Sequence, residues 1–362
     1  MSRAIHEARA TDDDENGSDT SKSAPQPIED WEALELPIAL LRGVFGMGFE
    51  RPSPIQSRAI RPLLQGGDVL GQAQSGTGKT GCFTIGALAR VELDVRTPQV
   101  LILSPTRELS FQTRKVVDSL GAHMKGLTTQ LLVGGTSTDR DISSLSASPP
   151  HVVVGCPGRV HDMLRRRRLG VADLKMVILD EADEMLSQGF KDQVYDIFQY
   201  LPDDVQVALF SATMPPVVRE LSTKFMRNPT EILVKAEMLT LEGISQYYVA
   251  LDDDDQKYAA LKDLYSKLSL SQCIVYCNSI RRVQDLYEAM KTDDFPVCQM
   301  HSGMEREDRQ TSFNDFSSGR TRVLISSNVT ARGIDLQQVS TVVNFDVPRC
   351  VETYLHRIGR SG

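Results

Sequence analysis

The sequence predicts an α/β protein made of two units, each with a parallel, doubly wound sheet. Short apolar runs such as "VLILS" (100–104), "HVVVG" (151–155) and "KMVILD" (175–180) end in small or polar residues, as strands buried on both faces do. Between them lie helix-length segments with apolar residues at helical spacing, for example "RELSFQTRKVVDSL" (107–120). This alternation indicates crossover connections between parallel strands.

The alternation pauses near "AEMLTLEGI" (236–244) and resumes with the runs "QYYVAL", "QCIVYC", "RVLISS" and "STVVNF". We therefore expect a second α/β unit after a short linker. The expected segments are an acidic tail (1–30), a first domain (31–236), a linker (237–245) and a second domain (246–362). In open parallel sheets, ligands bind beyond the carboxyl ends of the strands, so functional motifs are expected there.

Composition is that of a globular protein, with 41% apolar and 24% charged residues among 362. The first 30 residues hold eight acids and three Lys/Arg, so they carry five of the eight net negative charges. Such a polar segment is expected to be disordered. The nearly neutral remainder can still bind a polyanion through a local basic groove. We expect no membrane span and no secretion signal, and the six scattered cysteines indicate reduced thiols inside the cell.

The stretch "AQSGTGKT" (73–80) follows a strand-like run and opens a helix. It matches the phosphate-loop pattern, with Ala73 at the first glycine position. Glycines let backbone N–H groups point at phosphate oxygens, and the helix N-terminus favours negative charge. A plain glycine-rich turn is the alternative interpretation. The residues expected to bind the nucleotide phosphates are Ser75, Gly76, Thr77, Gly78, Lys79 and Thr80.

The run "VILDEAD" (177–183) delivers two acids at a strand end. Asp180, with Thr80, is the expected ligand set for Mg²⁺. Glu181 is expected to act as general base toward the attacking water, and Lys79 to meet the terminal phosphates. Acids at a strand end are common without a function, so the phosphate loop upstream is what favours this interpretation.

Residues 180–183 spell D-E-A-D, and stretches such as "LDEADEMLSQGFKDQVYDIF" and "LFSATMP" accompany them. From about residue 31 to 362 the chain resembles the DEAD-box RNA helicases, and within them the eukaryotic translation initiation factor 4A group, which includes a nuclear exon-junction relative. The resemblance implies two RecA-like domains of the P-loop NTPase class, which use ATP and Mg²⁺ and bind RNA across both domains.

By the same resemblance, the adenine site comprises Gln56 and Phe49 of "GFERPSPIQ" together with an upstream aromatic, here Trp31. A glutamine amide can pair with adenine, and aromatic rings offer a stacking face. Ordinary core packing is the alternative for Trp31. The "SAT" residues Ser211 and Thr213 would hydrogen-bond to Asp183 or its neighbours and couple hydrolysis to RNA binding.

The resemblance also implies an RNA groove that contacts phosphates without regard to base sequence and prefers single strands. Its expected residues are Thr106, Arg107, Gly134, Gly135, Gly158 and Arg159 from the first domain, with Asn278 and Arg309 from the second.

The motif "HRIGR" (356–360) resembles the family's arginine-finger motif. His356, Arg357 and Arg360 would cross the cleft to the γ-phosphate, beside Gly333 and Asp335 of "RGID". A solvated helix face is the alternative for two arginines three positions apart.

The chain departs from the family pattern at a few positions. Ser110 and Cys156 replace alanine and threonine, Arg306 replaces glutamine, and Ser327-Asn328 stands where relatives have Thr-Asp. None of these departures falls on Lys79, Asp180, Glu181 or the arginines, so we expect ATP binding to be intact. Asn328 removes a carboxylate that would organise the loop linking RNA to ATP, so the departures bear on RNA coupling. Relatives continue beyond "HRIGRSG", so we also expect an incomplete and marginally stable second domain.

The sequence thus predicts an ATP-dependent RNA helicase, active in translation initiation or messenger-RNA processing. The alternatives are an ATP-gated RNA clamp with slow turnover and a truncated inactive form. We expect a monomer in the cytoplasm, the nucleus or both, with protein partners of the initiation-factor or exon-junction type.

Overall fold

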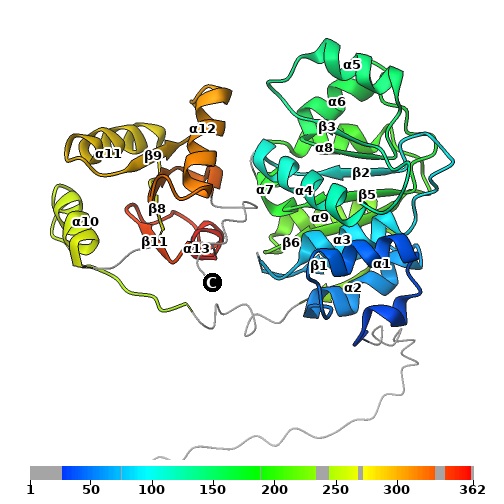
Figure 1. Ribbon diagram of the computed structural model, residues 1–362, viewed down its shortest axis with the longest axis horizontal. Coiled ribbons are helices and arrows are strands. Elements are labelled where there is room, and N and C mark those ends of the chain that lie inside the picture. The colour runs from blue at the N-terminus through cyan, green and yellow to red at the C-terminus, as the bar shows by residue number, and fades with distance from the viewer. Residues whose placement is uncertain are drawn as a thin grey trace, which may run out of the picture.

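The computed structural model describes residues 27–74, 76–187, 189–233, 244–267, 272–330 and 339–359. These residues form two bodies, here called the first and second lobe, which lie side by side in Figure 1. Each lobe has its own parallel sheet, so the predicted fold class is confirmed. Residues 1–26 of the expected tail and 237–243 of the expected linker lie outside the described residues, and the domain boundaries stay predictions.

The described part of the first lobe holds seven strands and the helices that connect them. The strands are β1 (Val69–Gln72), β2 (Val100–Leu103), β3 (Thr129–Leu132), β4 (Val152–Gly155), β5 (Met176–Asp180), β6 (Gln206–Ser211) and β7 (Thr230–Leu233). The helices are η1 (Trp31–Leu34), α1 (Ile38–Gly46), α2 (Pro54–Leu64), α3 (Lys79–Leu88), α4 (Arg107–Leu120), α5 (Thr138–Ala147), α6 (Pro157–Arg165), α7 (Ala182–Ser187), α8 (Lys191–Phe198) and α9 (Pro216–Phe225).

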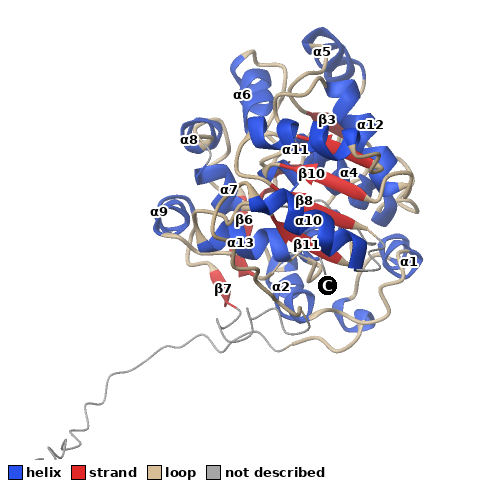
Figure 2. Ribbon diagram, turned by 90° about the vertical axis from the view of Figure 1, so that its left-hand side faces the viewer, coloured by secondary structure: helices blue, strands red, loops and turns tan. Residues whose placement is uncertain are grey.

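The second lobe has four described strands. They are β8 (Cys273–Tyr276), β9 (Val297–Met300), β10 (Val323–Ser326) and β11 (Thr341–Asn344). Its described helices are α10 (Gln256–Lys267), α11 (Ile280–Thr292), α12 (Arg306–Ser317), η3 (Asn328–Thr330) and α13 (Val351–Ile358). Apolar residues of α10 and α11 cover one face of the sheet and those of α12 the other, and Figure 2 shows α10 and α11 in front of the strands.

The order of strands in the first sheet is β3-β4-β2-β5-β6-β1-β7, and all pairs are parallel. The apolar runs at 100–104, 151–155 and 175–180 become β2, β4 and β5, and the segment 107–120 becomes α4. Strands β5, β6 and β1 are neighbours, with Asp180 opposite Phe210 and Gln72 opposite Ser211. Because the strands are parallel, the loops after all three meet at one edge of the sheet.

One strand-like run does not form a strand. Residues 246–251, "QYYVAL", are extended but unpaired among the described residues, and Tyr247 and Tyr248 are 91% and 92% exposed. The described second sheet ends at β11 on one side and β9 on the other, and neither edge strand pairs with this segment. An apolar pattern alone could not reveal that.

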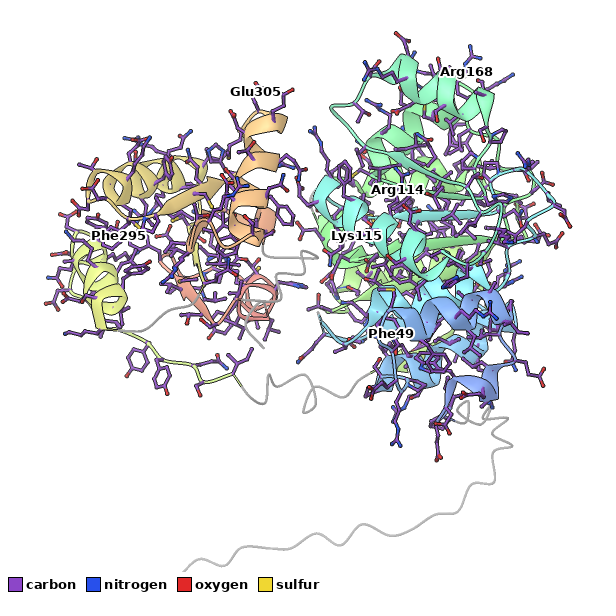
Figure 3. All side chains as sticks on the ribbon, viewed as in Figure 1. Phe49, Arg114, Lys115, Arg168, Phe295 and Glu305 are labelled. Carbon is purple, nitrogen blue, oxygen red and sulfur yellow. The ribbon has the colours of Figure 1, made fainter. Side chains whose placement is uncertain are left out.

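No helix within the described ranges has the length and apolar character needed to cross a bilayer. The charged runs at 165–168 and 252–255 are exposed to solvent. In "RRRR" (165–168), Arg165 and Arg166 both pair with Asp162 at 2.9 Å. Figure 3 shows Arg168 at the end of the first lobe away from α10.

Candidate active site

The loop between β1 and α3 has the backbone of a phosphate cradle. Gly76 and Gly78 have φ values of +82° and +92°, a conformation that favours glycine. Helix α3 begins directly after Gly78, so its unpaired N–H groups open toward the loop. Thr80 is half-buried at this helix start, and the Thr77 hydroxyl donates to the Gln74 carbonyl at 2.7 Å. The donors and the positive helix end fit an anionic phosphate chain.

Lys79 and Glu181 form a buried pair at the mouth of this loop. The Lys79 ammonium lies 2.9 Å from the Ala73 carbonyl oxygen and 3.4 Å from Glu181 Oε1. Their side chains are 5% and 3% exposed. Glu181 has a φ of +52°, an uncommon conformation for a residue with a side chain and one that clusters at functional sites. The β5 terminus thus holds a carboxylate against the phosphate-loop lysine.

Asp180 lies buried beside this pair. The pKa of the Asp180 carboxyl is raised to about 7, mainly by burial and next by the neighbouring Glu181 charge, while Lys79 acts to lower it. A raised pKa marks a carboxylate that is costly to ionise without a cation, as a metal-binding acid would be. Asp180 and Thr80 therefore fit Mg²⁺ in their donor chemistry.

The Asp180 pKa predicts a pH dependence of stability. Because the folded pKa lies above the ordinary value of about 4, this carboxyl destabilises the fold progressively as pH rises from about 4 to about 7. Without nucleotide or metal, the parent is expected to lose about 2 kcal/mol relative to Asp180→Asn between pH 5.5 and 7.5. Denaturant unfolding at both pH values measures this, and equal pH dependence of parent and variant would contradict it.

The expected adenine residues lie directly behind the phosphate loop. Gln56 Nε2 donates to the Gly78 carbonyl at 3.2 Å, and Gln56 Oε1 accepts from the Ser53 N–H at 2.8 Å. Phe49 lies in the N-terminal part of the first lobe (Figure 3), against Gly81 of α3. The glutamine therefore connects the start of α2 to the loop that would hold the phosphates.

Trp31 differs from the expectation. It is only 1% exposed, its indole N–H donates to the Phe49 carbonyl at 2.9 Å, and its ring stacks against that of Phe49 at 6.5 Å between centroids. The core-packing alternative describes it: Trp31 holds Phe49 from behind instead of offering an open face to a ligand.

Gly81 allows α3 to approach Phe49 and Gln56. A Cβ at this position would lie 2.9 Å from Phe49 Cε2 and 3.0 Å from Gln56 Nε2. Gly81→Ala is expected to displace both and raise the KM for ATP roughly tenfold, as overpacking of this size does. Steady-state ATPase kinetics measure this. Gly46→Ala is the matched control, since its Cβ would meet nothing within 4 Å; equal KM values in the two variants would contradict the assignment.

The Asp183 carboxylate joins three elements. Thr213 donates to Asp183 Oδ2 at 2.5 Å, and the Asp183 N–H donates to the Ser211 hydroxyl at 3.4 Å. The expected hydrogen bonds are therefore present, while the coupling role stays a prediction. His356 of the second lobe also reaches Asp183 Oδ2, at 3.3 Å from its Nε2. Both partners are buried, so this contact links the two lobes at the edge of the first sheet.

Arg357 requires a correction. It is 0% exposed and its guanidinium donates to the side chains of Asn278, Asn328 and Asn344 and to the Asp346 carbonyl. Burial lowers the pKa of this guanidinium. With its donors taken inside the second lobe, Arg357 does not face the phosphate loop as predicted, and the solvated-face alternative is also wrong. Asn278, predicted to contact RNA, is one of its partners.

Two other cations of the predicted groove, Arg159 and Arg309, have protein partners. Arg159 pairs with Asp141 and donates to the Thr136 hydroxyl at 2.9 Å. Arg309 of α12 donates to Glu108 of α4 at 2.8 Å, a second link between the lobes. The phosphates of a bound nucleic acid would accept hydrogen bonds from these arginines beside the Asp141 and Glu108 carboxylates or in their place.

The remaining groove residues lie at helix starts and strand ends. The Thr106 hydroxyl caps α4 by accepting from the Leu109 N–H at 3.3 Å. A Cβ at Gly135 would lie 2.6 Å from Arg107, and one at Gly134 3.4 Å from it, so the glycine pair makes room for this side chain. Gly158 is in the first turn of α6.

Sequence reasoning missed several contributors. Glu108 accepts from Arg309, and Asn344 accepts from Arg357. The Asp346 carboxylate accepts from the backbone N–H of Asn278. The one sequence signal that Glu108 could bind a cation was its position directly after Arg107 in the motif "PTREL". Four predicted residues, Ser75, Gly333, Asp335 and Arg360, lie outside the described ranges.

Comparisons with known proteins agree with this geometry. Residues 53–221 match the DEAD/DEAH box helicase family, and residues 256–362 match the helicase conserved C-terminal domain. The chain is 54% identical over 335 residues to "Eukaryotic initiation factor 4A" of Cryptosporidium parvum, covering 92% of this chain and 82% of that protein. It is 52% identical over 332 residues to "ATP-dependent RNA helicase eIF4A" of Saccharomyces cerevisiae (strain YJM789), with 92% and 83% covered.

Its fold is similar to the solved structure of S. cerevisiae Dbp5 bound to RNA and ADP BeF3, with a TM-score of 0.86 and 34% identity. That match covers 92% of this chain and 86% of the other, so it spans both lobes. The chain therefore belongs to the DEAD/DEAH box helicase family, within the eukaryotic initiation factor 4A group.

Proposed function

We propose that this protein is an ATP-dependent RNA helicase of translation initiation. The observation that carries this is the meeting of the phosphate loop, the Asp180-Glu181 pair and the Asp183–His356 contact between lobes at one sheet edge. The family membership and the names of the relatives support the same activity.

Each residue of the ATP site in the first lobe has a defined task. The loop at Gly76 and Gly78 holds the phosphates, and Lys79 moves from Glu181 to the terminal phosphate when ATP enters. Glu181, released from that pair, accepts the proton of the attacking water. Thr80 and Asp180 would hold Mg²⁺, whose charge neutralises the phosphate oxygens.

RNA binding uses cations that are paired within the protein. When single-stranded RNA binds, its phosphates compete with the carboxylates that pair with Arg159 and Arg309. Each arginine then binds a phosphate in place of its carboxylate or together with it. Since Arg309 and His356 both contact the first lobe, RNA bound across the lobes favours the same arrangement that assembles the ATP site. The coupling is a shared binding free energy and is reciprocal.

A clamp with slow turnover is a second candidate. Among the described residues, the contacts Arg309–Glu108 and His356–Asp183 join the lobes. In addition, 92% of the chain matches the structure of S. cerevisiae Dbp5 bound to RNA and ADP BeF3. A closed arrangement that is stable in itself would retain RNA for long periods instead of separating strands.

Strand separation tests the two candidates. With ATP, the full chain is expected to separate a short RNA duplex at a rate that exceeds RNA dissociation measured with a non-hydrolysable ATP analogue. Slow dissociation combined with no strand separation would favour the clamp.

We further propose that the protein acts as a monomer in the cytoplasm or nucleus, with initiation-factor or exon-junction partners.

A further inference from the structure

Arg357 gathers three loops at the carboxyl edge of the second sheet. Its Nη2 donates to Asn278 Oδ1 at 2.7 Å, after β8, and its Nη1 donates to Asn344 Oδ1 at 3.1 Å, at the end of β11. Asn328, after β10, accepts twice, from Nε at 3.0 Å and from Nη2 at 2.7 Å. We call Arg357 and these three asparagines the Arg357 cluster.

The cluster holds a buried cation with uncharged acceptors. Among the described residues, the oxygens that accept from Arg357 are three side-chain amides and the Asp346 carbonyl. The Asp346 carboxylate lies nearby but pairs with Lys257 at 3.2 Å and Arg282 at 3.0 Å, and accepts from the Asn278 N–H at 3.0 Å. The Tyr276 ring, 5.1 Å from the guanidinium, adds a weak cation–π contact.

Asn328 is the position where exchanging one side-chain nitrogen for oxygen would add a charged acceptor to the cluster. It accepts two guanidinium hydrogens through a single amide oxygen, whereas a carboxylate would offer a second oxygen and so permit two parallel N–H···O bonds, the arrangement that binds arginine most strongly. Hydrogen bonds to an ionised acceptor are roughly twice as strong as neutral ones. An amide here makes the junction of the three loops weaker than the same geometry permits.

The cluster is connected to the first lobe through helix α13. His356 precedes Arg357 and contacts Asp183 Oδ2, which also accepts from Thr213. A loosened cluster would therefore let α13, and with it His356, shift relative to the loop after β8. Only the ordered arrangement presents His356 and the loop at Asn278 correctly, so the population of that arrangement scales the apparent affinity.

We propose that Asn328 and Arg357 are a positioning pair that sets the strength of coupling between RNA and nucleotide, and that the amide of Asn328 keeps this coupling low. This inference depends on the proposed function. The pair acts by fixing α13 and the strand-end loops of the second lobe.

The test is Asn328→Asp in the full chain. Affinity for a fluorescent single-stranded RNA is measured by anisotropy with and without a non-hydrolysable ATP analogue, and the ratio gives the coupling factor. We expect Asn328→Asp to raise that factor roughly 3- to 10-fold. It should also lower the RNA concentration for half-maximal ATPase, while kcat at saturating RNA changes little.

Asn314→Asp is the matched control, since Asn314 lies exposed on α12 and gives the same charge change away from the cluster. It is expected to leave the coupling factor unchanged. A rise in melting temperature of Asn328→Asp with an unchanged coupling factor would make the pair merely structural and overturn the proposal. Absence of RNA-stimulated ATPase in the parent would instead remove the proposed function, and this inference with it.

Discussion

Glu181→Gln is expected to lower RNA-stimulated ATP hydrolysis by a factor of about 10²–10⁴ while ATP still binds. Glutamine keeps the shape of the side chain but cannot accept the proton of the attacking water. Glu181 is held for that task by a buried site and a backbone φ of +52°. Because the amide also removes a negative charge beside Asp180, affinity for the anionic nucleotide is expected to be equal or higher.

Single-turnover hydrolysis and equilibrium binding of a fluorescent nucleotide measure the two effects separately. Glu184→Gln is the matched control, three residues further along in α7 and also buried, and its hydrolysis rate is expected to stay within fivefold of the parent. Hydrolysis by Glu181→Gln at near-parental rate would exclude Glu181 as the general base.

Lys79→Met is expected to abolish nucleotide binding and also to destabilise the nucleotide-free protein. The first effect follows from the loss of the phosphate-binding cation. The second follows because Glu181, only 3% exposed, loses the charge 3.4 Å from its carboxylate. Removing one partner of a buried pair costs on the order of 3 kcal/mol. Methionine fills the volume of the lysine stem, so a cavity does not confuse the comparison.

The double variant Lys79→Met/Glu181→Gln separates these effects. It is expected to recover most of the lost stability, because no uncompensated carboxylate remains at position 181, yet to stay inactive. Denaturant unfolding of the parent, both single variants and the double variant gives the coupling energy of the pair. Additive losses of stability would show that the contact contributes nothing to folding.

The phosphate loop and the acids were predictable from sequence because their geometry is local. Strand β5 ends where its apolar run ends, and the helix after the glycines must begin at Lys79. Parallel pairing then brings the ends of β1, β5 and β6 together, while the Asp183–Thr213 hydrogen bond was expected from the family resemblance.

Other features depend on residues far apart in the chain. The burial of Arg357 is decided by Asn278, Asn328 and Asn344, which come from three separate loops. The Arg309–Glu108 contact depends on how two lobes meet, which no local pattern encodes. Trp31 matched a motif position, but the packing behind Phe49 decided its role.

The most direct test is the rate of ATP hydrolysis by the full chain with and without single-stranded RNA. A helicase that joins both lobes around ATP and RNA should hydrolyse ATP at least tenfold faster when RNA is present, with far less response to DNA of the same sequence. A rate that is insensitive to RNA, or raised equally by DNA, would contradict this account.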